Sequence, residues 1–176
     1  MAIISMDIIK CVVVGDTAVG KTSLYFSYIN ELNSCTPTVF NTYSSLSRYE
    51  KNTVILTYYD NGGSAEYDCY RPVCYGLTDI ALLCFAVDDE ESFQNLKLKW
   101  IPEIRKYCPK ASIFVVGTKT DLRGTKPCMD REEGQYLCLE NWFDYFECSI
   151  YDYDSIRELF DAVISETAGK RNIKPL

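Results

Sequence analysis

The sequence predicts a single α/β domain whose mostly parallel β-sheet has helices on both faces. Its 176 residues match the size of one domain, and 47% hydrophobic residues are enough to form a core. Strand-length apolar runs alternate with segments of helical periodicity, which is typical of successive βαβ units. A glycine-containing loop directly after the first strand fits the same class, in which ligands bind at the carboxyl ends of the strands.

The first half of the chain is predicted to contain two strands and one helix. Residues 8–14 form an apolar run that ends at Gly15, as expected for a buried strand. Residues 21–32 follow the glycine-containing loop and are assigned to a helix. Residues 53–59 form a second β-rich run, which ends at Asp60, Asn61, Gly62 and Gly63 and is assigned to a strand.

The second half continues the alternation. Residues 92–108 carry apolar side chains at a spacing close to 3.6, which predicts an amphipathic helix that bends near Pro102. Gly169 is expected to end the last helix. The remaining elements are strands at residues 79–87, 111–117 and 145–149 and helices at residues 130–141 and 155–168.

Composition excludes several classes of function. A formal charge of −7 disfavours general binding of nucleic acids. The chain has no histidine, so triads, zinc sites and general bases that need histidine are excluded. Nine scattered cysteines without a C-x-x-C pair indicate a reducing compartment, and a cytoplasmic location is expected. No apolar run reaches the ~18 residues of a membrane span, and the N-terminus is not expected to be a signal peptide.

Residues 15–22 read G-D-T-A-V-G-K-T and match the phosphate-binding pattern G-x-x-x-x-G-K-[ST] in the strand–loop–helix context that it requires. Gly15 and Gly20 let the backbone curl, so that N–H groups and a helix N-terminus surround an anion. Lys21 supplies a full charge, and the Thr22 hydroxyl is a candidate Mg²⁺ ligand. The candidate phosphate-binding residues of this phosphate loop are Gly15, Thr17, Ala18, Val19, Gly20, Lys21 and Thr22.

A second polar loop, formed by Thr118, Lys119, Thr120 and Asp121, follows the strand predicted at residues 111–117. The Asp121 carboxylate can accept hydrogen bonds from the ring N–H and the exocyclic amine of guanine, whereas adenine offers neither donor at those positions. The wrong base would leave a buried carboxylate unpaired, and sites built in this way discriminate by ~10⁴–10⁵. The sequence therefore predicts a guanine nucleotide.

From about residue 8 to residue 168 the sequence resembles the Ras-like small GTPases, and within them the Rho/Rac family. Besides the phosphate loop, the resemblance rests on residues 36–40 as a first switch and residues 60–63 as the D-x-x-G start of a second switch. Residues 117–119 and 147–149 resemble the family's base-binding loops. The implied fold is a P-loop NTPase G domain with a six-stranded, mostly parallel sheet over residues 1–176, of which 169–176 would be a short tail.

The resemblance also implies ligands and roles, with GTP or GDP and Mg²⁺ as cofactors. Thr38 would bind Mg²⁺ through its hydroxyl and the γ-phosphate through its backbone, Asp60 would hold Mg²⁺ through a water, and the Gly63 N–H would contact the γ-phosphate. The backbone N–H groups of Ser149 and Ile150 would meet the base. Effector proteins would read a surface that includes Val39, Phe40 and Tyr43.

Two departures from the family bear on GTP hydrolysis. Ser64 stands where the family has the glutamine that orients the attacking water, and its side chain is too short to reach that water. Thr17 stands where the family has glycine or a very small residue, and it would crowd the γ-phosphate and an incoming arginine finger. Hydrolysis is therefore expected to be slow or absent, as in Rnd-type Rho proteins, unless a neighbour such as Glu66 compensates.

Further departures concern nucleotide exchange and membrane attachment. Cys35 replaces a family tyrosine, and the loop between Lys21 and Thr38 is about two residues shorter, so faster exchange is expected. The segment between Asp121 and Cys148 is too short for the extra helix of most Rho proteins. The sequence carries no prenylation motif, so attachment to the inner face of the plasma membrane is expected only with a lipidated tail.

The leading interpretation is a monomeric Rho-like GTPase that switches between GTP and GDP and signals to effectors that regulate the actin cytoskeleton. The expected partners are effector proteins, exchange factors, activating proteins and dissociation inhibitors. One alternative is a pseudo-GTPase or constitutively GTP-bound adaptor that acts purely by binding proteins. Another is a P-loop phosphotransferase acting on a small substrate, but the sequence shows switch motifs in place of the lid and acceptor site that such an enzyme needs.

Overall fold

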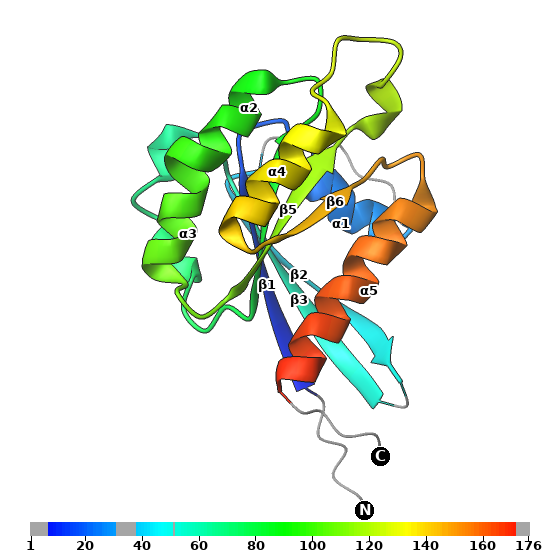
Figure 1. The fold of residues 1–176 in the computed structure, drawn as a ribbon. Helices are drawn as coiled ribbons and strands as arrows, with labels where there is room; N and C mark the ends of the chain where they lie inside the picture. Colours follow the sequence, from blue (N-terminus) through cyan, green and yellow to red (C-terminus); the bar gives the residue numbers. More distant parts are fainter. Residues whose placement is uncertain (1–6, 31–37, 51, 172–176) are drawn as a thin grey trace, which may run out of the picture.

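The computed structural model describes residues 7–30, 38–50 and 52–171. Six strands form one sheet in the order β2-β3-β1-β4-β5-β6 (Figure 1). All neighbouring strands are parallel except β2 and β3, which are antiparallel. The strand bounds are β1 Asp7–Gly15, β2 Phe40–Tyr49, β3 Asn52–Asn61, β4 Ile80–Ala86, β5 Ser112–Thr118 and β6 Asp144–Glu147. The predicted α/β fold with a six-stranded, mostly parallel sheet is confirmed.

Helices cover both faces of the sheet, with α1 and α5 on one face and α2, α3 and α4 on the other (Figure 1). Their bounds are α1 Lys21–Tyr28, α2 Glu90–Asn95, α3 Ile101–Tyr107, α4 Arg131–Asn141 and α5 Tyr153–Lys170. Shorter helical segments are Ala65–Tyr67, Arg71–Cys74 and Thr120–Leu122, and Leu96–Trp100 forms a π-helical turn between α2 and α3.

The central strands separate two hydrophobic cores. Alternate residues of β1 point to opposite faces, so Ile9 and Val13 pack with α1 and α5, whereas Val12 and Val14 pack with α2, α3 and α4. Both sets of side chains are fully buried. This explains why the strand reads as a continuous apolar run, because a parallel strand covered on both faces has no solvent-facing side.

Four elements differ from the sequence-based prediction. Strand β2 was not predicted, because it is an edge strand whose side chains are mostly exposed and polar. The expected helix at residues 92–108 starts earlier and is interrupted by the π-helical turn, which lies directly before Ile101 and Pro102. Gly169 does not end the last helix, since α5 includes it and continues to Lys170.

The first helix is also shorter than expected. It ends at Tyr28, and Asn30 has a φ of 56°, a left-handed conformation that α-helices do not contain. The predicted helix end at residue 32, together with Cys35, lies outside the described residues, as do residues 172–176 of the expected tail.

Most described cysteines serve as small core residues, as predicted. All eight are free thiols, and Cys11, Cys84, Cys108, Cys138 and Cys148 are buried, whereas Cys69 is exposed. In the part of the chain that the structure describes, no helix has the length and hydrophobicity needed to cross a lipid bilayer.

Candidate nucleotide site

Four loops that the sequence analysis singled out meet at one edge of the sheet. They follow the carboxyl ends of β1, β3, β5 and β6, which are neighbours in the sheet with only β4 between β1 and β5. Parallel strands bring their carboxyl ends to the same edge, so residues far apart in the sequence come together there. The predicted clustering of the phosphate loop, the second switch and the two base loops is therefore observed.

The phosphate loop has the curled backbone that its glycines predict. Gly15 has a φ of 146°, and a Cβ at this position would overlap the carbonyl oxygen of Cys84. Gly20, which precedes α1, has a φ of 99°. Between them, Ala18 adopts a left-handed conformation with a φ of 64°. The loop thus combines left-handed residues with a helix N-terminus, the arrangement that presents N–H groups to an anion.

Lys21 lies over this loop. Its side chain is almost fully buried, and Nζ donates hydrogen bonds to the carbonyl oxygens of Gly15 (2.9 Å) and Asp16 (2.6 Å). Burial lowers the pKa of Lys21, while nearby negative groups, including Asp60, act in the opposite direction. An ammonium group has three N–H donors, and two of those on Lys21 make the hydrogen bonds above. The third can donate to a phosphate oxygen.

Three oxygen-bearing side chains converge beside Lys21. Thr22 Oγ1 donates to Asp60 Oδ2 (2.5 Å) and lies 2.8 Å from Thr38 Oγ1, which is itself 3.3 Å from the same carboxylate oxygen. The other oxygen, Asp60 Oδ1, is buried and has no hydrogen-bond partner within the described chain. Burial raises the pKa of Asp60, whereas hydrogen bonds from Thr22 and Thr38 and the charge of Lys21 act to lower it. Hydroxyl and carboxylate oxygens are the ligands that Mg²⁺ prefers, and an unpaired buried carboxylate oxygen needs a partner, so these residues fit a magnesium ion.

The two switch segments contact each other and the phosphate loop. The Gly62 N–H donates to the carbonyl oxygen of Val39 (2.9 Å), which links the second switch to the first. A Cβ on Gly63 would lie 2.5 Å from Gly15 O and Thr17 N, so Gly63 packs directly on the phosphate-loop backbone. Only glycine fits at this approach. Ser64 follows at a half-buried position, and the Thr17 side chain is exposed on the loop.

A cavity of about 320 Å³ extends from the phosphate loop to the base loops, within the usual size range of ligand pockets. Lys119 and Asp121 line it from one side, Ile150 and Tyr151 from another, and Ala18 and Gly20 lie at its phosphate end. Lys119 adopts a left-handed conformation with a φ of 60°. Residues predicted to bind the base therefore share one cavity with Ala18 and Gly20 of the phosphate loop, whereas Lys21 and Thr22 are not among the described residues that line it.

Side-chain hydrogen bonds hold these loops together. Ser149 Oγ donates to Asp121 Oδ1 (2.6 Å), and Thr118 Oγ1 lies 2.5 Å from the carbonyl oxygen of Val19 in the phosphate loop. The Ser149 N–H, which the family resemblance assigned to the base, already donates to Ser155 Oγ (3.2 Å). Ser149 therefore acts in this structure through its hydroxyl, which orients the carboxylate of Asp121.

Tyr151 and Asp16 belong to the site but were not singled out from the sequence. Tyr151 lines the base cavity with a ring that is 82% exposed, and its position directly after Ser149 and Ile150 was the available signal. Asp16 lies inside the phosphate loop, and its carboxylate accepts hydrogen bonds from Asn95 Nδ2 (2.6 Å) and Trp100 Nε1 (2.7 Å). Nothing in the sequence spacing indicated that these distant residues meet.

The predicted effector surface is only partly exposed. Val39 and Phe40 are 56% and 43% exposed, so a partner can reach them. Tyr43 instead stacks on Tyr25 of α1, with ring centroids 5.1 Å apart, and packs against the core. Residues 36 and 37 of the first switch lie outside the described residues.

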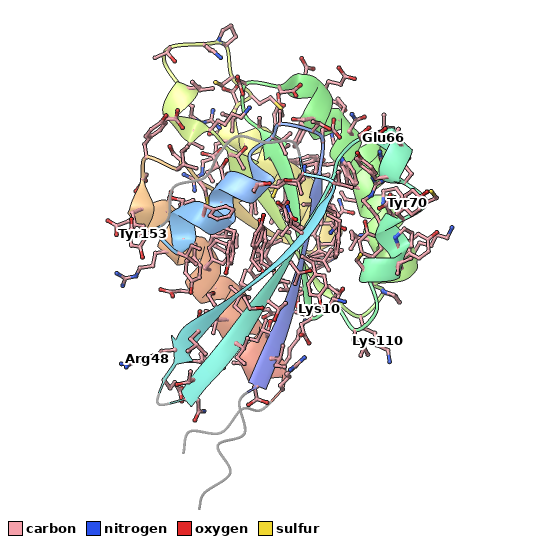
Figure 2. All side chains as sticks on the ribbon, turned by 180° about the vertical axis from the view of Figure 1, so that it is seen from behind. Lys10, Arg48, Glu66, Tyr70, Lys110 and Tyr153 are labelled. Carbon is pink, nitrogen blue, oxygen red and sulfur yellow. The ribbon has the colours of Figure 1, made fainter. Side chains whose placement is uncertain are left out.

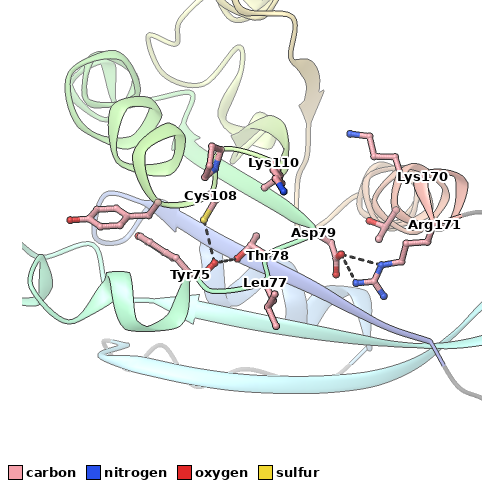
Figure 3. A pocket seen from close by; sticks show the side chains of 12 residues that line it. Tyr75, Leu77, Thr78, Asp79, Cys108, Lys110, Lys170 and Arg171 are labelled. Atoms are coloured by element: carbon pink, nitrogen blue, oxygen red, sulfur yellow. Dashed lines mark hydrogen bonds and ion pairs between the residues drawn. The ribbon is translucent and has the colours of Figure 1, made fainter.

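A larger cavity of about 540 Å³ lies near the opposite ends of the strands (Figure 3). It is lined by residues that precede β4 and β5, such as Thr78 and Ala111, and by the end of α5. The guanidinium of Arg171 pairs there with Asp79 and does not face a free anion site. Because Ala18 and Gly20 of the phosphate loop and the Asp121 carboxylate line the smaller cavity, that cavity is the candidate nucleotide site.

Comparison with protein families agrees with this geometry. The model of the Ras family matches residues 10–169, which is most of the chain and includes all four loops described above.

Proposed function

The chain belongs to the Ras family, and we propose that within this family it is a Rho-like guanine-nucleotide switch in which GTP hydrolysis is slow. Ras-family proteins are small GTPases that bind GTP or GDP, typically with Mg²⁺, and interact with effectors and regulators. The finer assignment, to a Rho-like switch with weak hydrolysis, rests on residues in which this chain resembles or departs from the wider family.

One observation carries the switch function. Thr22 and Thr38 come from the phosphate loop and the first switch, and their hydroxyls meet the same carboxylate oxygen of Asp60 at the end of β3. A bound Mg²⁺ would neutralise phosphate charge at this point. The chain's own residues then couple the segments, because any ligand that engages both threonines also fixes the position of the first switch.

The local structure at residues 17 and 64 supports slow hydrolysis. Serine is two heavy atoms shorter than glutamine, so Ser64 cannot place a polar group where the family's glutamine orients water. Glu66 is the neighbour that was expected to be able to compensate, but it lies on the surface (Figure 2) and hydrogen-bonds the Tyr67 hydroxyl, an interaction that raises the pKa of Tyr67. Thr17 adds a branched side chain to the loop on which Gly63 packs.

The Rho-like assignment extends to partners and place of action. Exposed Val39, Phe40 and Tyr70 would contact effector proteins of the actin cytoskeleton, exchange factors and dissociation inhibitors, since exposed apolar and aromatic side chains favour protein interfaces. Figure 2 shows Tyr70 pointing outward beside Glu66 on the second switch. We propose a monomer in the cytoplasm, with peripheral attachment to the plasma membrane only through a lipidated tail.

Single-turnover hydrolysis tests the proposal. Purified protein is loaded with GTP and Mg²⁺, and phosphate release is followed with and without a Rho-type activating protein. Unaided Ras hydrolyses GTP at ~3–5 × 10⁻⁴ s⁻¹, and an arginine finger adds ~10⁵-fold. We expect a rate at least tenfold below the unaided value and little acceleration. A rate equal to that of Ras, or strong acceleration, would overturn slow hydrolysis but not nucleotide binding.

A further inference from the structure

Arg71 follows the D-x-x-G start of the second switch, and its side chain donates five hydrogen bonds. It lies in the short helical segment Arg71–Cys74, and its side chain is only 2% exposed. Its guanidinium donates to Glu103 on α3, to Asp68, and to two backbone carbonyl oxygens. A buried charge with this many partners holds a fixed geometry.

One side of the guanidinium is anchored to the helical layer. Nε and Nη2 donate to the two carboxylate oxygens of Glu103 (2.9 and 3.1 Å), a bidentate pair. The Tyr75 hydroxyl donates to the same carboxylate. The guanidinium also lies over the Trp100 ring, with Cζ 4.7 Å from its centroid. Arg71 therefore has little freedom to move relative to α3.

The opposite side holds the backbone around Gly63. Nη1 donates to the carbonyl oxygens of Gly62 and Ser64, each at 3.2 Å, and these are the carbonyls on either side of Gly63. The Gly62 carbonyl and the Gly63 N–H belong to one planar trans peptide and point in opposite directions. Fixing the Gly62 oxygen toward Arg71 therefore directs the Gly63 N–H away from Arg71.

The Trp100 indole, which lies under the Arg71 guanidinium, also contacts the phosphate loop. Trp100 Nε1 donates to Asp16 Oδ1 at 2.7 Å, and Gly63 packs on the backbone of residues 15–17. Trp100 thus contacts the Arg71 guanidinium with its ring and the phosphate loop with its N–H. This arrangement sets the position of Gly63 relative to the loop by protein contacts alone.

We propose that Arg71 is a positioning residue for recognition of the third phosphate, because it holds the Gly63 N–H in the orientation that a γ-phosphate oxygen requires. The inference rests on the proposed function and deepens it at the same site. It implies that the second switch is ordered before GTP binds, so that GTP binding loses no conformational entropy in this segment. GDP, which has no γ-phosphate, gains nothing from the contact.

The test compares the affinities of Mg²⁺–GDP and of a non-hydrolysable Mg²⁺–GTP analogue for Arg71→Ala and for the unmodified protein. We expect analogue affinity to fall at least tenfold and GDP affinity to change less than threefold. Arg71→Lys should not restore analogue affinity, because a lysine cannot bridge two carbonyls and a carboxylate with one planar fork. Arg105→Ala is the matched control, since Arg105 lies on α3 but bonds Asn141, and it should leave both affinities unchanged.

Loss of Arg71 leaves Glu103 without its main partner and can unfold the chain. If thermal unfolding shows this, Arg71→Ala/Glu103→Ala removes both charges and is measured in its place. Hydrogen exchange of residues 62–67 in the GDP state gives an independent readout, with faster exchange expected in the variant. Equal losses for both nucleotides, or unchanged analogue affinity, would overturn the inference. Failure of the unmodified protein to bind either nucleotide would instead overturn the proposed function.

Discussion

The Ser149 hydroxyl donates a 2.6 Å hydrogen bond to Asp121 Oδ1 and so joins the loop after β6 to the loop after β5. Asp121 is exposed on the cavity wall, where a free carboxylate would rotate among several orientations. The bond fixes the orientation of the carboxylate, and each of its oxygens keeps a lone pair that can accept a hydrogen bond from a ligand. We therefore expect base selection in this site to depend on both residues, which lie 28 positions apart in the sequence.

Asp121→Asn should change the base that the site selects. The asparagine amide keeps one acceptor but replaces the second with an NH₂ donor, which faces the exocyclic amine of guanine and matches the carbonyl of xanthine at that position. Affinity for GDP should fall at least 100-fold and affinity for xanthosine diphosphate should rise. Competitive displacement of a fluorescent nucleotide measures both, with Ser149→Ala as a milder control. Retained GDP affinity would contradict this role of Asp121.

Thr22→Ala should remove most of the effect of Mg²⁺ on nucleotide affinity. The Thr22 hydroxyl is one of three oxygen groups that converge on the candidate metal position, and alanine supplies no ligand. Dissociation of GDP should become faster in excess Mg²⁺ and approach the rate that the unmodified protein shows in EDTA. Stopped-flow release of labelled GDP in both media tests this. A Mg²⁺ effect of unchanged size would show that the ion binds elsewhere.

Restoring the family residues at two positions should restore hydrolysis. Ser64→Gln returns a side chain long enough to orient water, and Thr17→Gly removes the branched group next to Gly63. We expect at least a tenfold faster single-turnover rate for the double variant, equivalent to ~1.4 kcal/mol of barrier. Thr125→Gly, a surface threonine in the loop after β5, serves as control. If the double variant is no faster, another feature limits hydrolysis.

Thiol reactivity should follow burial. Burial raises the pKa of Cys138 and Cys148 to about 12, so at pH 8 about 10⁻⁴ of either thiol is ionised. Cys69 is exposed and should react with iodoacetamide first among the described cysteines. Because the buried thiols hold their protons more tightly than unfolded ones, their contribution to stability should be lost as pH rises from about 9 toward 12. Peptide mapping after brief labelling at pH 8 tests the order, and early labelling of Cys148 would contradict it.

Tyr58→Phe should lower stability modestly. The Tyr58 side chain is fully buried, and its hydroxyl donates to the carbonyl oxygen of Lys21 (2.8 Å) at the start of α1. Loss of this bond should lower the free energy of unfolding by ~0.5–1.5 kcal/mol. Urea unfolding at a fixed GDP concentration measures it. Tyr59→Phe, at a half-buried position in the same strand, should have a smaller effect, and the reverse order would contradict the assignment.

The sequence predicts an element correctly where its hydrophobic pattern reflects its burial in the fold. Buried strands such as β1 and β4 are continuous apolar runs, and the phosphate loop carries a spacing that allows one backbone shape. Strand β2 was not predicted because it lies at the edge of the sheet, between β3 and solvent. Its polar residues therefore follow no hydrophobic period. The end of α5 was mispredicted because Lys170 and Arg171, directly after Gly169, contact Ser112 and Asp79 elsewhere in the fold.

The sequence identifies the site residues that belong to a short motif. It does not identify those that only the folded chain brings together. Lys21, Thr22, Asp60 and Asp121 belong to short patterns. The contacts of Arg71 with Gly62, and of Trp100 with Asp16, join segments 9 and 84 residues apart. Such contacts depend on how α3 packs against the sheet, which no local spacing records.

We propose that this edge of the sheet holds a guanine nucleotide. The most direct measurement is to purify the protein in Mg²⁺, denature it, and separate the released nucleotide by anion-exchange chromatography. We expect close to one guanine nucleotide per chain, with GTP in excess over GDP. An adenine nucleotide, or no nucleotide together with no affinity for added GDP or GTP, would contradict it.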